Sequence, residues 1–455
     1  MGTRIRPLSG AERQLWLLSR VSPFQIVLAL ELSPGVPTPD EDALRAALEK
    51  VRGRHPLLRV RVAVAVRGQT LVFEECDSPI PLRLVRGAPD LTAVIEEELN
   101  LAVPTDTGPL LRAVLVTPDE GRAAVLLTFD HTAADGISVS AVFREVLAAL
   151  SRQEDAQADE AARPATPQNV APSIAGLPRT VRRPWFWLRF LGRRLADLWW
   201  RIRHGAIRPI PHRSVPAAEQ RARIIRHEFD PKDVATLRGR AASEGVSLHA
   251  VLCAAQLLAI RGLFNGDGPM PLAVYSPTDL RPRLEWEGRT RVPPDHMGQY
   301  VGYACSMHRV RPNAGLWDLA REIRDQITAR VAASDDLGYN VLNHVLMRIL
   351  ARWFRPDDKG AARLSRAAAG SMSHTTVMTN LGEVAPADTL KGASPEGASL
   401  HVAMSNLPGS VFVSGAVRLS GRLGWSFAWA EPCLDAATAR ALADAAIAQL
   451  RCALR

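Results

Sequence analysis

Apolar and polar residues follow two periods along the chain, one typical of helices and one typical of strands. In the first third, apolar positions three and four apart predict helices, and short apolar runs bounded by turn residues predict buried strands. The expected elements are a helix over 38–54, a strand pair over 59–66 and 71–75, a second pair over 110–116 and 123–129, and a helix over 136–150. Turns are expected at Arg67-Gly68 and in TPDEGR (117–122), and TPDE (38–41) has the form of a capping box with proline in the first helical position.

The second half of the chain also mixes helices and strands. Its pattern predicts helices over 246–263, 316–331 and 434–450, a strand over 272–276 and paired strands over 411–430. Since these do not alternate as βαβ units, the pattern favours an α+β fold over a doubly wound sheet. A chain of 455 residues is too long for one ordinary core. We therefore expect an N-terminal lobe (1–155), a linking segment (156–213) and a C-terminal lobe (214–455), with 152–180 as a linker or surface loop rich in Ala, Pro, Ser and Thr.

The stretch TFDHTAADGISVS (128–140) places a histidine, an aspartate and a glycine between a predicted strand and a predicted helix. Neutral imidazole can take a proton from a hydroxyl or amine and return it to a leaving group, so His131 is a candidate general base. Asp135 is poorly placed for a proton relay in so tight a loop, and we expect it to turn inward to a cation. Gly136 would permit a backbone conformation or a close approach that other residues do not. A histidine at a strand end is by itself more often structural, so His131 needs further support.

Composition and the absence of known motifs argue against several classes of protein function. The net charge of +9 is concentrated around residues 179–213, which argues against a nucleic-acid groove through the whole fold. The five cysteines are scattered without metal-like spacing, so neither a disulfide framework nor a metal site is expected. GxSxG, Walker, HExxH and GxGxxG motifs are absent, which removes the main support for hydrolase, nucleotide-binding and zincin classes. The sequence has neither a membrane-length apolar run nor a signal-peptide pattern, so a cytoplasmic location is expected.

The six residues His-Thr-Ala-Ala-Asp-Gly (131–136) resemble the HxxxDG signature of the condensation-domain superfamily of acyltransferases. That group includes nonribosomal peptide condensation domains, polyketide-associated acyltransferases, wax ester synthases, alcohol acetyltransferases and chloramphenicol acetyltransferase. Further segments follow in the order usual for the superfamily: LSGAERQLWLL near the N-terminus, VRGRHPLLRVRV (51–62), YSPTDLRPRL (275–284), GQYVGYACSMHRV (298–310) and TNLGEV (379–384). The DLR segment is similar to that of the polyketide-associated and alcohol-acylating branch, and the resemblance covers nearly the whole chain.

The resemblance implies two chloramphenicol-acetyltransferase-like lobes that form a V, with a central channel and His131 at its centre. It implies a thioester donor, acyl-CoA or a phosphopantetheinyl carrier protein, that serves as co-substrate, with no permanently bound cofactor. Donor and acceptor would enter from opposite faces. We expect Asp135 to pair with Arg281 of the DLR segment rather than with Arg283. Asn380 is expected either to line the channel or to form a turn.

The chain departs from the superfamily's pattern in two places. Many members carry two histidines, HHxxxDG, and here Asp130, a second candidate channel residue, stands at the first of these positions. The DFGWG loop of condensation domains is also missing, and SGRLGWSFAW (420–429) occupies that region. The resemblance assigns the general base to the second histidine, which is present. The departures weaken only the assignment to a peptide-bond-forming domain.

The segment RRPWFWLRFLGRRLADLWWRIRHG (182–205) predicts a basic amphipathic helix that is rich in tryptophan. Such helices are typical of peripheral proteins that lie in a membrane interface. The alternative is a crossover between lobes whose apolar face is packed against them. We favour membrane or lipid contact, which suggests that one substrate is lipidic. The expected contact residues are Trp185, Trp187, Arg189, Arg193, Arg194, Trp199 and Trp200.

These features together predict a thioester-dependent O-acyltransferase with His131 as the general base. Its acceptor is expected to be a hydrophobic alcohol of lipid or polyketide type. Two alternatives stay open: amide formation on an amine by the same histidine, and a non-catalytic condensation-like module that binds a carrier protein or lipid.

Overall fold

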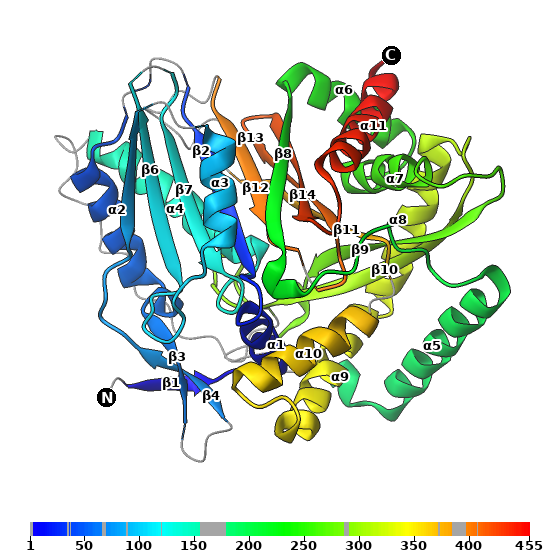
Figure 1. Cartoon of the computed structure of the whole chain (residues 1–455), viewed down its shortest axis with the longest axis horizontal. Coiled ribbons are helices and arrows are strands. Elements are labelled where there is room, and N and C mark those ends of the chain that lie inside the picture. The colour runs from blue at the N-terminus through cyan, green and yellow to red at the C-terminus, as the bar shows by residue number, and fades with distance from the viewer. Residues whose placement is uncertain are drawn as a thin grey trace.

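The chain folds into two lobes, each with mixed sheets covered by helices, as Figure 1 shows. A computed structural model describes residues 3–33, 36, 38–65, 70–87, 90–119, 121–154, 179–285, 291–371, 374–384, 397–406 and 408–455. The predicted α+β, two-lobed fold is confirmed.

The N-terminal lobe is built from residues at the start of the chain and one strand from near its end. Its elements are β1 (Arg4–Pro7), α1 (Gly10–Ser19), β2 (Gln25–Glu31), α2 (Glu41–Arg54), β3 (Val60–Val64), β4 (Leu71–Glu75), β5 (Leu82–Gly87), α3 (Leu91–Asn100), β6 (Leu111–Pro118), β7 (Ala124–Asp130), α4 (Gly136–Glu154) and β12 (Ser399–Met404). A five-stranded sheet has the order β12-β2-β7-β6-β5, and a three-stranded sheet has the order β1-β4-β3. The central strands β2 and β7 are almost wholly buried because helices and the other lobe cover both faces of the sheet.

The C-terminal lobe is built on a six-stranded sheet. Its elements are β8 (Arg221–Phe229), α6 (Pro231–Ser243), α7 (Leu248–Arg261), β9 (Met270–Asp279), β10 (Val301–Val310), α8 (Leu316–Ala332), β11 (Thr376–Glu383), β13 (Phe412–Leu419), β14 (Arg422–Glu431) and α11 (Ala436–Leu454). The strand order is β10-β9-β11-β13-β14-β8. The sequence LHAVLCAAQLLAIR of α7 is apolar on every side, and the helix is accordingly buried along nearly its whole length beside α8 and α11.

Three further helices lie beside the two lobes' sheets, and two of them add Met347, Ala361, Leu364 and Ala368 to the core of the N-terminal lobe. The three helices are α5 (Pro184–His204), α9 (Asp335–Ile349) and α10 (Asp358–Ser371). Helices α9 and α10 pack against α1, whereas α5 lies at the edge of the molecule next to α9 (Figure 1). Among the described residues, no single helix is long and apolar enough to cross a membrane. Only α6 and α7 taken together, with a bend of 96° between them, have the length and composition of a span.

The element predictions are confirmed with small shifts of the boundaries, apart from two corrections. The helix expected from residue 38 begins at Glu41, because Asp40 rather than Thr38 is the N-cap and accepts a hydrogen bond from the amide of Ala43. The predicted lobe division is also modified, because β12 lies within 214–455 and yet pairs with β2. The predicted turn at Arg67-Gly68 falls outside the described residues. So does the part of the linking segment from residue 156 to residue 178.

Candidate active site

His131 lies where a fully buried strand ends. Strand β7 pairs with β2 and β6 and stops at Asp130, so His131 is the first residue of the loop. Its backbone amide donates to the carbonyl of Phe24 at 3.1 Å. The Phe24 ring stacks on the imidazole, with ring centroids 5.0 Å apart and planes 4° from parallel. Both contacts come from the residue that precedes β2, and they hold the ring from one side.

The side-chain amide of Gln299 holds the other side of His131. Its Nε2 is 2.8 Å from Nδ1 of the ring, and it donates to the backbone carbonyls of His131 and of Ala134. An amide NH₂ has two hydrogens, and these two carbonyls accept them. The Nδ1 nitrogen is therefore enclosed by protein groups, and Nε2 is the nitrogen left to face a substrate. Sequence reasoning missed Gln299, although it lies within the GQYVGYACSMHRV segment that matched the superfamily as a block.

The imidazole is neutral at physiological pH. Burial lowers the pKa of His131, and the hydrogen bonds to the carbonyls of His131 and Ala134 and the charge of Asp135 only partly oppose this. A neutral imidazole with one enclosed nitrogen and one accessible nitrogen can accept a proton.

Asp135 and Arg281 form the predicted ion pair. The guanidinium binds the carboxylate through two hydrogen bonds, of 2.9 and 3.0 Å, and the two side chains are only 1% and 3% exposed. The carboxylate also accepts from the amides of Ser138 and Tyr300, so it caps the start of α4 and ties it to the segment before β10. Burial alone would raise the pKa of Asp135, but Arg281 and these amides hold it below its usual range. Arg283, the partner considered less favourable for Asp135, pairs with Asp336 instead.

Gly136 is the first residue of α4, and its missing side chain leaves room for Leu381. It is not among the described glycines with positive φ, so no special backbone conformation requires it. A Cβ atom at this position would collide with the side chain of Leu381. Of the two roles considered for this glycine, the close approach is therefore the one that the structure has.

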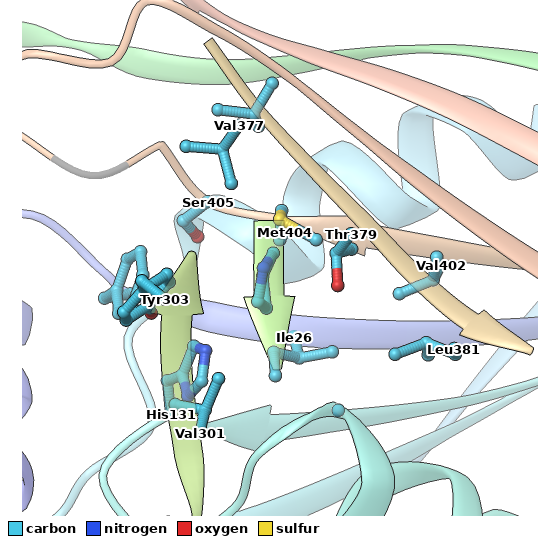
Figure 2. A pocket seen from close by; sticks show the side chains of 14 residues that line it. Ile26, His131, Val301, Tyr303, Val377, Thr379, Leu381, Val402, Met404 and Ser405 are labelled. Atoms are coloured by element: carbon cyan, nitrogen blue, oxygen red, sulfur yellow. The ribbon is translucent and has the colours of Figure 1, made fainter. Parts of the chain in front are cut away.

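A small, largely apolar cavity of about 60 Å³ lies in front of His131. Strands from both lobes line it: Figure 2 shows Val301 and Tyr303 of β10, Thr379 and Leu381 of β11, and Met404 of β12 around the imidazole. This space is enough for a few water molecules or a small chemical group.

A second cavity, of about 320 Å³, adjoins the first along β10. Val301 and Tyr303 line both cavities, and Gln299 lines the second one while it contacts the His131 ring. The remaining walls come from α1, α9 and the strands β9 and β10. A space of this size is in the range of small-molecule sites. The small cavity in front of His131 and this larger one therefore adjoin each other at Val301 and Tyr303.

The two candidate channel residues do not line either of these cavities. Asp130 is buried and lines a separate hollow on the far side of the sheet, and burial raises the pKa of its carboxyl to about 6. Asn380 lies between Thr379 and Leu381, which face the cavity, and its side chain accepts from the amide of Gly382. Asn380 thus lies within strand β11 and makes a local hydrogen bond beside the break in its pairing with β13.

The predicted membrane-contact residues fall into two groups on α5. Trp185, Arg189 and Trp199 are exposed. The others face the protein: Trp187 donates to the carbonyl of Val181, and Trp200 packs against the core cluster that contains Cys305 and Met307. Arg193 and Arg194 both pair with the buried Asp335. The expected head-group role of Arg193 and Arg194 is thus corrected, because their charges are already paired within the chain.

Comparison with known proteins gives one family match and a set of partial relatives. Residues 218–417 match the family described as the C-terminus of phthiocerol/phthiodiolone dimycocerosyl transferase. Phosphinothricin tripeptide synthetase PhsC of Streptomyces viridochromogenes is 24% identical over 344 residues, which are 72% of this chain and 30% of that protein. The chain spans at most 30% of the length of the curated relatives it matches.

Two solved structures share the fold over nearly the whole chain. Polyketide synthase associated protein 5 of Mycobacterium tuberculosis superposes with a TM-score of 0.64 and 19% identity, covering 99% of this chain and 98% of that one. The trichothecene 15-O-acetyltransferase TRI3 of Fusarium sporotrichioides gives a TM-score of 0.73 and 11% identity, covering 99% and 95%. These likenesses establish the fold.

Proposed function

Because the chain belongs to the condensation-domain superfamily of acyltransferases, we propose that it transfers an acyl group from a thioester to a hydroxyl of a hydrophobic acceptor. The donor is acyl-CoA or an acyl carrier protein, acting as a co-substrate. The observation that carries the proposal is the His131 ring, whose Nδ1 is enclosed and whose Nε2 is left to a cavity lined by both lobes.

His131 acts as the general base. Its Nε2 takes the proton of the acceptor hydroxyl while the hydroxyl oxygen attacks the thioester carbonyl carbon. The tetrahedral intermediate then collapses as the carbon–sulfur bond breaks, and the imidazolium returns the proton to the leaving sulfur. The products are an ester and a free thiol. The lowered pKa of His131 suits this role, because the imidazole starts each cycle without the extra proton.

Two hydroxyl groups beside the cavity are candidates to stabilise the negative charge on the carbonyl oxygen. Thr379 and Tyr303 both line the space in front of the imidazole. Burial raises the pKa of Tyr303 to about 12, so its phenol keeps its proton and can donate a hydrogen bond. Sequence reasoning did not single out either residue, although they lie in the GQYVGYACSMHRV and TNLGEV segments that matched the superfamily.

Turnover of a generic acyl-CoA with a medium-chain alcohol tests the proposal. Thiol release and the ester product are measured for wild type, for His131→Ala and for His212→Ala as a matched control, because His212 is an exposed histidine remote from the cavity walls. We expect His131→Ala to lower kcat by ~10²–10⁴-fold with donor binding nearly unchanged. Retention of more than about a tenth of wild-type turnover would rule His131 out as the base.

Amide formation by the same histidine is the second candidate. It is favoured by the relatives named as peptide synthetases, whereas the matched family is named for a transferase. Offering the alcohol and an amine of equal chain length in one reaction separates the two chemistries. A non-catalytic binding module would give no turnover with either acceptor, and His131→Ala would then change nothing.

A further inference from the structure

The exposed apolar side chains of the protein are gathered on two neighbouring segments. Apart from Val64 and Leu101, every large apolar residue that is exposed in the described part of the chain lies on α5, on α9 or at Trp353 just after α9. On α5 they recur every three or four positions: Trp185, Leu188, Leu191, Leu195, Leu198 and Ile202. On and after α9 they do the same: Tyr339, Leu342, Leu346, Ile349 and Trp353. We call these two stripes the α5–α9 face.

The α5 stripe points outward because the opposite side of the helix packs against α9. Phe190 is buried and stacks against Phe186 and edge-on to Tyr339, and Gly338 of α9 fits directly against the Phe186 and Phe190 rings. The guanidinium of Arg194 lies 5.0 Å from the centre of the Phe190 ring while it pairs with Asp335. The helix therefore docks through its aromatic and paired basic side, and its leucine side is left uncovered in the described structure. The crossover alternative, in which the leucine side is packed, does not describe this arrangement.

The exposed charge on the same two segments is of one sign, because Asp335 and Asp336 at the start of α9 are buried and paired with arginines. Residues 179–213 contain ten arginines and one acidic residue, Asp197, which pairs with Arg330. Residues 337–356 contain no acidic residue at all. The exposed basic side chains include Arg183, Arg189 and Arg203 at α5 and Arg348, Arg352 and Arg355 at and after α9. A protein partner could cover an apolar stripe, but tryptophan and leucine flanked by unopposed arginine complement an anionic lipid surface.

We propose that the α5–α9 face lies in the interface of a membrane that contains anionic lipid, and that the hydrophobic acceptor reaches the active site from that side. The second part rests on the proposed acyltransferase function. Tyr339 connects the membrane contact with the acceptor route, because it belongs to the exposed stripe and also lines the 320 Å³ cavity. From there Val301 and Tyr303 lead to the space in front of His131. A long alcohol held in the bilayer would thus reach the base without crossing water.

Flotation with vesicles tests the membrane contact. Wild type is mixed with vesicles of phosphatidylcholine alone or with added phosphatidylglycerol. We expect flotation with the anionic vesicles, and partial release near 1 M salt, where the Debye length falls to ~3 Å. Leu195→Glu combined with Ile202→Glu should lower the vesicle partition coefficient by roughly tenfold or more, because each change removes a side chain from the apolar layer. Both residues are exposed, at 58% and 74%, so the substitutions leave the fold intact.

The control variants distinguish this membrane contact from non-specific adsorption to vesicles. Leu101→Glu is matched to the stripe variants, since Leu101 is 50% exposed and lies on the N-terminal lobe, and it should float as wild type does. Arg189→Gln with Arg203→Gln should remove the salt-sensitive part of binding. Wild type that ignores anionic vesicles, equal flotation with neutral vesicles, or equal loss in Leu101→Glu would overturn the proposal. The proposal would also be overturned if light scattering showed that wild type is a dimer and that the stripe variants are monomers. The face would then be a self-association surface.

Activity distinguishes failure of the membrane proposal from failure of the proposed function. The Leu195→Glu, Ile202→Glu variant should keep wild-type turnover with a short soluble alcohol and lose it with a long alcohol carried in vesicles. Equal turnover of the vesicle-borne alcohol in both proteins would refute access from the membrane side. If wild type acylates no alcohol at all, the proposed function fails, and flotation still decides the membrane contact.

Discussion

The ion pair between Asp135 and Arg281 should be worth far more to stability than the surface pairs of this arginine-rich protein. Removing one member of a buried pair leaves an uncompensated charge and typically costs ~3–5 kcal/mol. An unfolding entropy of about 2 cal/mol/K per residue over 455 residues amounts to roughly 1 kcal/mol/K, so the melting temperature of Asp135→Ala or Arg281→Ala should fall by ~3–5 °C. Removing Arg20, whose partner Asp358 is 84% exposed, should shift it by less than about 1 °C.

A double-mutant cycle measures how much of this cost belongs to the pair itself. The double variant should be less destabilised than the sum of the single variants, since the second change removes the charge that the first left unpaired. The coupling should be smaller than either single effect, because Arg281 also binds Asp279 and the carbonyl of His296, and Asp135 also accepts from the amide of Tyr300. Thermal unfolding of the four proteins gives the result. Additivity within ~0.5 kcal/mol would refute a direct interaction between the two side chains.

The contribution of the Asp135 carboxylate to the free energy of unfolding depends on pH in a defined way. The pKa of Asp135 is lowered in the folded protein, so the carboxylate stabilises the fold at every pH above its unfolded pKa of about 3.9. This contribution is lost only as the pH falls through the lower folded value. The gap between wild type and Asp135→Asn should therefore stay constant from about pH 5 to 8 and close in stronger acid.

Two further predictions concern residues around the base. Gln299→Leu should lower kcat by roughly ten- to a hundredfold with KM little changed, because the imidazole loses the contact that orients it. It should also move the acid limb of the kcat/KM profile to higher pH, since amide N–H dipoles no longer disfavour the imidazolium; an unmoved limb would mean that Gln299 only packs. Asp130→Asn should stabilise the protein at pH 8 by up to ~3 kcal/mol, because the folded pKa of about 6 lies above the unfolded value, so ionisation of the buried acid costs free energy above pH 6. The difference should vanish near pH 4, and equal melting differences at pH 4 and pH 8 would contradict this account.

The sequence predicted best where a single local pattern decides the structure. The all-apolar run before Asp130 and the three-four spacing after Gly136 make strand, loop and helix unambiguous, and they place His131 at the strand end. That Asp135 needs a cation follows from its place in a tight loop, whereas the choice of Arg281 came from the resemblance of the DLR segment to the superfamily. Local patterns say little about amide side chains, however. Gln299 reaches His131 across 168 positions of sequence, and nothing in its neighbourhood distinguishes it from a surface glutamine.

Tertiary packing also decided three features that periodicity alone left open. The amphipathic pattern of 182–205 was clear, but which side of the helix faces the protein depends on the Phe190 contacts with α9, which no periodicity encodes. The apolar stripe on α9 resembles a core face in sequence and is nevertheless exposed. The assignment of β12 to the other lobe's sheet likewise depends on pairing between residues about 370 positions apart, such as Ser399 and Glu31.

The pairing of β12 with β2 has a consequence for synthesis of the protein. When α4 has left the ribosome, the N-terminal sheet is complete except for its edge, and β2, with the sequence QIVLALE, presents an unpaired apolar strand. The missing partner ends at Met404, about 250 residues after Glu154, which corresponds to roughly 12–50 s of translation at 5–20 residues per second. During that interval β2 is a template for pairing with other nascent chains. The first 155 residues made alone would keep this edge permanently, so production of the isolated N-terminal half should yield aggregates that co-expression of the remaining chain, with its β12, prevents.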